Sequence, residues 1–207
     1  MLLYSYYMLM VICFAISMFY YMRSLSTKMI TWLLFISILT EIIVEICKHT
    51  GRKYYILYHF FTPIEYLFIG LYFYHSVKNK TFKSFCLSSI IFFLLICTIS
   101  IFLNYKLESF PRFISYLECF FLLILSTLSL LFLDPNTDKA IYKVSDFWFS
   151  IAFLLFNSSL FIVLFFNQND KVIKEIFSLI NLSFNCLLYF LLIVGFLCLK
   201  TKRNIFY

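Results

Sequence analysis

The sequence predicts an all-α fold, a polytopic bundle of about seven transmembrane helices with no soluble domain. Of its 207 residues, 63% are hydrophobic and only 13% are charged, whereas soluble domains carry about 25% charged residues. Apolar runs of roughly 20 residues, the length of helix that crosses a bilayer, recur along the whole chain. The charged residues gather in short stretches between these runs, as they do in the loops of membrane proteins.

These charged clusters delimit seven apolar spans, each long enough to cross the hydrocarbon core as a helix. The first run has neither a basic segment before it nor a small-residue cleavage site, so we expect a retained helix rather than a signal peptide. Even the longest loop, residues 134–146, is too short for a soluble domain, so residues 1–207 are expected to form a single transmembrane domain. The predicted spans are about residues 2–22, 29–47, 54–74, 85–103, 113–133, 147–166 and 176–199.

The basic residues between the spans predict the orientation, because short cytoplasmic loops carry an excess of Lys and Arg. Ten basic residues fall on the side of the C-terminus: Arg23, Lys28, Lys78, Lys80, Lys83, Lys139, Lys143, Lys200, Lys202 and Arg203. Seven fall on the opposite side: Lys48, Arg52, Lys53, Lys106, Arg112, Lys171 and Lys174. The difference favours an N-terminus outside the cell membrane and a cytoplasmic C-terminus. We attribute the net charge of +7 to contacts with anionic head groups of the lipid bilayer, and expect no nucleic-acid partner.

The third span, residues 54–74, carries one carboxylate, Glu65, near its centre. A charged side chain at that depth is costly, so an intramembrane glutamate is by default a candidate functional residue. No Lys or Arg lies deep in any predicted span, so the helices offer Glu65 no salt-bridge partner. What satisfies this glutamate is therefore the central question about the chain.

Several other polar residues are predicted to lie in the same half of the bilayer as Glu65. The second span ends on the membrane face where the third, fifth and seventh spans begin, and this holds for either orientation. Glu41 and Glu45 are four residues apart, as are Asn181 and Asn185, so each pair shares a helix face. The candidate ligand-binding residues are Glu41, Glu65, Glu118, Tyr58, His59, Tyr116, Asn181 and Asn185.

Three explanations of the glutamates remain open. A glutamate can be protonated and hydrogen-bonded to asparagine or tyrosine, and Tyr58, two helical turns from Glu65, and Tyr116 are spaced to reach the carboxylates. Several glutamates can share a metal ion or a proton. Alternatively, they can await a cationic ligand in a pocket lined by aromatic rings. No cofactor is predicted other than such a cation, for which the metal-ligand candidates are Glu41, Glu45, Glu65, Glu118 and His59.

The segments LYHFFTPIEYLF, FISYLECFFLLILS, DFWFSIAFLLFNSSLF and INLSFNCLLYFL lie in the third, fifth, sixth and seventh spans. They resemble successive blocks of an uncharacterised family of small seven-span bacterial integral membrane proteins. The resemblance implies a seven-span architecture in the bacterial inner membrane and supports the polar set, but it implies no reaction. The matching positions are Tyr58, Glu65, Tyr116, Glu118, Phe147, Trp148, Asn181 and Asn185.

The sequence disfavours several functions of multi-span proteins. A retinal protein needs a lysine near the middle of its last span, and residues 176–199 contain none. Hydrolases of the ceramidase and progestin-receptor type use three histidines, but His49 and His75 flank opposite ends of the third span, about 39 Å apart. An alternating-access transporter normally shows repeats and helices broken by glycine or proline, but this chain has only three glycines and a single proline within a span, Pro63.

The sequence therefore favours a multi-pass membrane protein with an acidic and aromatic intramembrane pocket. We expect a ligand- or cation-binding sensor or accessory subunit of a membrane signalling or defence system, acting through a homo-oligomer or a cytoplasmic signalling partner. One alternative is a proton or cation channel, and another is a metal- or Glu-dependent lipid-modifying enzyme. The enzyme is less favoured because the sequence shows no catalytic signature.

Overall fold

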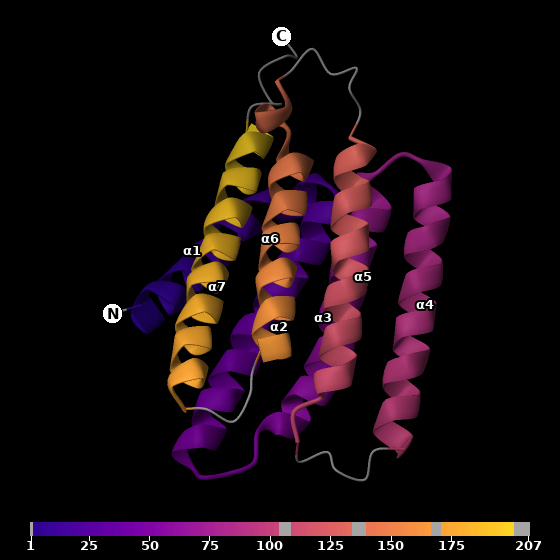
Figure 1. Cartoon of the computed structure of the whole chain (residues 1–207). Coiled ribbons are helices and arrows are strands. Elements are labelled where there is room, and N and C mark those ends of the chain that lie inside the picture. Colours follow the sequence, from indigo (N-terminus) through magenta and orange to yellow (C-terminus); the bar gives the residue numbers. More distant parts are fainter. Residues whose placement is uncertain (1, 104–108, 134–139, 167–170, 201–207) are drawn as a thin grey trace.

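The computed structural model describes residues 2–103, 109–133, 140–166 and 171–200 (Figure 1). The helices are α1 (Leu2–Tyr20), α2 (Leu25–His49), α3 (Tyr55–Ser76), α4 (Lys80–Leu103), α5 (Arg112–Leu131), α6 (Ser145–Phe166) and α7 (Lys171–Lys200), with short 3-10 helices η1 (Tyr21–Arg23) and η2 (Ile141–Lys143). All seven α-helices are long and apolar enough to cross a membrane, and the described residues form no strand. The predicted all-α class with seven spans is confirmed, and the chain has the architecture of a multi-pass membrane protein.

Helices α2, α4 and α7 begin four or five residues ahead of the predicted spans, because their charged first turns are helical and do not belong to the loops. At the start of α2, the Thr27 amide donates to Ser24 Oγ at 3.1 Å and the Ser24 amide donates to Thr27 Oγ1 at 3.2 Å. This reciprocal pair is a capping box. At the start of α4, Asn79 Oδ1 accepts a hydrogen bond from the Phe82 amide at 3.0 Å. These caps satisfy amides that would otherwise lack partners within the helix.

The helices form a ring in which most neighbours in space are neighbours in sequence. α3 packs against α2, α4 and α5, and α6 packs between α5 and α7. The ring closes where α1 contacts both α2 and α7. α4 has its main contacts with α3 and α5 and stands at one edge of the bundle (Figure 1). The interior of the ring is therefore bounded by every α-helix except α4.

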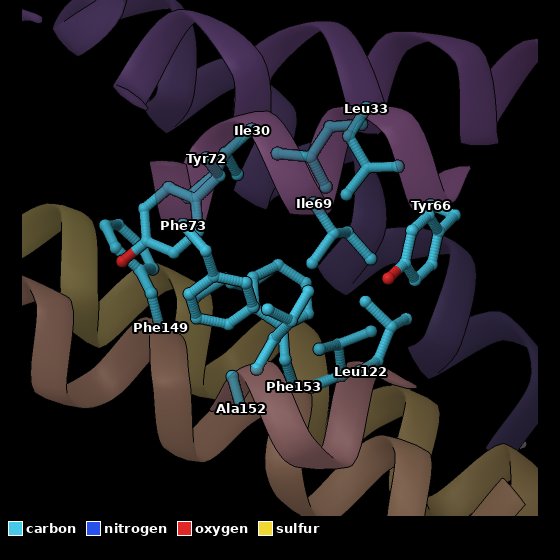
Figure 2. Close-up of a cluster of buried hydrophobic side chains, with 14 of the residues drawn as sticks. Ile30, Leu33, Tyr66, Ile69, Tyr72, Phe73, Leu122, Phe149, Ala152 and Phe153 are labelled. Atoms are coloured by element: carbon cyan, nitrogen blue, oxygen red, sulfur yellow. The ribbon is translucent and has the colours of Figure 1, made fainter. Parts of the chain in front are cut away.

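A cluster of large aromatic side chains fills one half of this interior (Figure 2). Tyr72 and Phe73 of α3 meet Phe149 and Phe153 of α6, and the Tyr72 and Phe149 rings lie edge to face with centroids 5.6 Å apart. All four are at most 1% exposed. Helix association within lipid depends on close packing rather than on a hydrophobic driving force, so these contacts hold α3 and α6 together.

The end of the bundle where α1 and α7 finish carries basic side chains over tyrosine rings, and we call it the basic end (upper end of Figure 1). Its cation–ring pairs are Arg23–Tyr20, Lys28–Tyr21, Lys83–Tyr74 and Lys143–Tyr142, at 5.4 to 5.9 Å from the ring centroids. Arg23 also donates a hydrogen bond to the Leu199 carbonyl, which ties η1 to the end of α7. Tyrosine and lysine at this level are typical of a membrane–water interface.

Candidate functional site: an acidic cavity inside the ring

A cavity of about 250 Å³ lies inside the ring, in the half opposite the basic end. Its walls come from α1, α2, α3, α5, α6 and α7 together with Phe110, and α4 contributes no side chain. On the side of the basic end it reaches Phe153, a member of the aromatic cluster. The cavity therefore lies where the second span ends and the third, fifth and seventh begin, which is where the sequence places its polar residues.

Six of the eight predicted binding residues line this cavity. Three are carboxylates from three different helices, Glu41 of α2, Glu65 of α3 and Glu118 of α5. Tyr58 lies two turns before Glu65 on the same face of α3, as its spacing predicts. The remaining two are Asn181 and Asn185 of α7. Asn185 Nδ2 donates to the Asn181 carbonyl at 2.9 Å, so this amide is partly satisfied within its own helix.

The other two predicted binding residues, His59 and Tyr116, are not among the residues that line this cavity. His59 Nε2 lies 2.9 Å from the carbonyl oxygen of Ser109, and this contact joins α3 to the segment before α5. Tyr116 packs edge to face against Phe161 of α6, with centroids 5.8 Å apart, so it does not reach Glu118. The reason is angular, because each residue turns a helix by about 100° and these side chains point away from neighbours that face the cavity.

Glu45, predicted as a candidate metal ligand, also lies outside the cavity. Its carboxylate is 3.2 Å from Lys48 Nζ and 3.8 Å from His49 Nε2, at the exposed end of α2. Among the described residues, no group of three His, Cys, Asp or Glu side chains is close enough to hold a metal ion. The predicted metal set, Glu41, Glu45, Glu65, Glu118 and His59, is therefore dispersed rather than gathered at one point.

Glu118 is the most constrained of the three cavity carboxylates. Its side chain is 5% exposed, and its Oε1 has no hydrogen-bond partner among the described residues. Glu65, on the neighbouring helix α3, interacts with it electrostatically. An ionised carboxylate that is buried without a partner costs roughly several kcal/mol of free energy. The geometry therefore calls for a proton or a bound positive group at Glu118.

Glu41 has a partner that the sequence does not reveal. Tyr6 Oη of α1 donates to Glu41 Oε1 at 3.1 Å, and the Tyr6 ring packs against Tyr189 of α7 at 5.7 Å. Both tyrosines line the cavity. The only sequence signal for Tyr189 is its position inside the last span, away from the interfaces where most tyrosines of membrane proteins lie. Tyr6 and Tyr189 thus connect α1 and α7 to Glu41 on α2.

The electrostatic character of the cavity is uniformly acidic. Among the described residues that line it there is no Lys, Arg or His. Its apolar wall includes Phe61, Phe110, Phe153 and Phe156. Aromatic faces carry partial negative charge and attract cations, so rings and carboxylates favour the same kind of ligand.

Removing the Tyr6 hydroxyl should measurably destabilise the α1–α2 contact. We expect Tyr6→Phe to lower the free energy of unfolding by about 1 kcal/mol, because Glu41 loses a partly buried donor while the ring is retained. Thermal unfolding in lipid nanodiscs measures the change. Tyr7→Phe is the matched control, since the Tyr7 ring lies 5.1 Å from the Tyr6 ring but its hydroxyl has no such hydrogen bond to Glu41 among the described residues. Equal effects of the two substitutions would contradict a role for the Tyr6–Glu41 bond.

No family model, no curated protein and no solved structure matches the chain. The resemblance to a family of small seven-span bacterial proteins therefore stays a prediction.

Proposed function

We propose that this multi-pass membrane protein binds a small organic cation, an ammonium compound, in the acidic cavity. One observation carries the proposal: among the described residues, a buried carboxylate oxygen of Glu118 has no partner, and the cavity beside it is lined by two further glutamates and by no basic side chain. A cation supplied from outside the chain satisfies that oxygen and relieves the repulsion between Glu118 and Glu65. The protein then acts as a sensor or accessory subunit of a membrane signalling or defence system.

The size and walls of the cavity favour an organic ammonium over a metal ion. A cavity of about 150 Å³ admits benzene, so the space here, about 250 Å³, suits a small organic molecule and greatly exceeds a bare ion. Metal ions need several ligands at one point, whereas these carboxylates stand on separate helices. An alkylammonium spreads its contacts, because the charged group binds carboxylate while the carbon chain packs against phenylalanine.

Helix α3 provides a physical connection from this cavity to the basic end. Tyr58 and Glu65 line the cavity, and further along the same helix Tyr72 Oη donates to Asp146 Oδ1 of α6 at 3.2 Å. A cation drawn towards Glu65 would therefore shift a helix whose far end is bonded to α6. We propose that the cavity faces the outside of the bacterial inner membrane. The basic end would meet a cytoplasmic signalling partner or a second copy.

The channel and enzyme hypotheses receive less support from the same geometry. Conduction needs a continuous path, and beyond the cavity the ring is filled by Tyr72, Phe73 and Phe149, each at most 1% exposed. A channel would have to open this aromatic cluster. A lipid-modifying enzyme would use Glu65 or Glu118 as an acid or base. Cation flux into proteoliposomes, or turnover of a lipid extract by the purified protein, would favour these alternatives.

The test is a set of cations compared by thermal unfolding of the protein in nanodiscs. We expect n-butylammonium and 1,4-diammoniobutane to raise the unfolding temperature, with about 2.7 kcal/mol of stabilisation at a hundredfold excess over Kd. Butyramide, a neutral molecule of similar size, is the control for apolar binding, and Na⁺, Mg²⁺ and Ca²⁺ are the controls for metal binding. Stabilisation by butyramide alone, or by a metal ion alone, would overturn the proposed ligand class.

A further inference from the structure

A second, apolar groove of about 330 Å³ lies between α1 and α2 and shares no residue with the acidic cavity. It is lined by Phe14, Met18, Tyr21, Thr31, Trp32 and Phe35. Met18, Trp32 and Phe35 are each between 39% and 53% exposed, so the groove opens on the outer surface of the bundle. In a chain that spans a membrane, this surface faces lipid.

A lysine stands at the interfacial end of this groove. Lys28 Nζ lies 5.6 Å from the centroid of the Tyr21 ring, which itself lines the groove. Lys28, Trp32 and Phe35 are spaced four and three residues apart, so they form one stripe along α2. Lys28 is in the first turns of α2, and Phe35 lies about 10 Å further into the membrane by the helical rise. The stripe thus runs from a cation at the level of the head groups to an aromatic floor at the level of the acyl chains.

We infer that this groove is a binding site for an anionic phospholipid, with an acyl chain between α1 and α2 and the phosphate on Lys28. The positive charge of Lys28 favours an anionic lipid over a second copy of the chain as the occupant. A second copy docked through the same face would bring another Lys28 towards the first, as two-fold interfaces pair identical patches. A phospholipid phosphate instead supplies the charge opposite to lysine together with the chain that fits the apolar floor. The inference is independent of what the acidic cavity binds.

Trp32 makes the site directly observable, because the chain has only two tryptophans. In a Trp148→Phe background, Trp32 is the single indole reporter in the groove. The protein is reconstituted in phosphatidylcholine bilayers that contain the same mole fraction of either brominated phosphatidylglycerol or brominated phosphatidylcholine. Bromine on the acyl chains quenches an indole that the chain contacts. We expect stronger quenching of Trp32 by brominated phosphatidylglycerol than by brominated phosphatidylcholine. The difference should correspond to about fivefold higher occupancy of the groove by the anionic lipid, because one lysine near a membrane surface contributes about 1 kcal/mol.

Two lysine substitutions separate this site from general attraction to the basic end. Lys28→Gln should remove the preference of Trp32 for brominated phosphatidylglycerol. Lys83→Gln should retain it, because Lys83 lies over the Tyr74 ring at 5.4 Å at the same end of the bundle but does not flank the groove. Equal quenching by the two brominated lipids, or equal loss of preference in the two variants, would overturn the inference. Loss of all quenching on raising the protein-to-lipid ratio would point instead to a second copy in the groove.

Discussion

Glu118→Gln is expected to abolish ammonium binding while leaving the bundle folded. The substitution keeps the size and shape of the side chain but removes the buried charge that would pair with the ligand. Losing one partner of a buried charge pair costs about 3 to 5 kcal/mol, which corresponds to binding weaker by roughly 150-fold or more. Titration of n-butylammonium against the wild-type protein and the variant in nanodiscs measures the difference.

The unliganded variant should be at least as stable as the wild type. Glu118 Oε1 is buried without a partner among the described residues, so a neutral amide removes a desolvated charge from the empty cavity. Stability gained where binding is lost is a recurrent feature of functional sites. Glu45→Gln is the control, because Glu45 pairs with Lys48 outside the cavity and its loss should leave the affinity unchanged. Wild-type affinity in both Glu118→Gln and Glu65→Gln would exclude the cavity as the binding site.

Gly195→Ala is expected to destabilise the contact between α6 and α7 by about 1 to 3 kcal/mol, the usual cost of overpacking a core. A Cβ at position 195 would lie 2.6 Å from Cε1 of Phe149, closer than real Cβ atoms approach another heavy atom. Phe149 is 1% exposed and packs against both Tyr72 and Phe196, so its ring has little room to move. Thermal unfolding in nanodiscs should therefore show a clear drop, and Gly195→Leu a larger one.

A second substitution tests the cause of this destabilisation. Phe149→Leu removes the ring that the new Cβ would strike, at the cost of some packing against Tyr72. If the clash is the cause, the double variant should lose less stability than the sum of the two single variants, because residues in contact are not additive. Strict additivity would mean that the alanine acts elsewhere in α7.

The sequence allowed two properties of the acidic site to be predicted: which carboxylates lie within apolar spans, and which half of the bilayer they occupy. Glu41, Glu65 and Glu118 stand out because carboxylates are rare inside apolar spans, and antiparallel connection by short loops places them in one half of the bilayer. The rotation of each helix about its own axis could not be predicted. His59 and Tyr116 are near the cavity in sequence but point elsewhere, since about 100° per residue separates adjacent side chains and hydropathy does not fix which face is inward.

The tyrosines that gather around Glu41 were the least predictable part of the site. Tyr6 reaches Glu41 because α1 packs beside α2, and Tyr189 is brought to the same place by the contact of α1 with α7. Short loops indicate which consecutive helices are neighbours, but they carry no information about a contact between the first and last helices. In a chain with 16 tyrosines, composition cannot distinguish Tyr6 and Tyr189, which line the cavity together with the predicted Tyr58, from the tyrosines at the interfaces.

The closure of the ring by α1 and α7 has a consequence for biosynthesis. Helices enter the bilayer in order, so Glu41, Glu65 and Glu118 are all inserted before α7 exists to cover them. Until α7 is inserted, the side of the cavity that carries Asn181 and Tyr189 is missing, and the three carboxylates contact lipid, water or the insertion machinery instead. The cavity therefore cannot assemble until α7 has been inserted, and a nascent chain halted before α7 would leave this acidic surface uncovered.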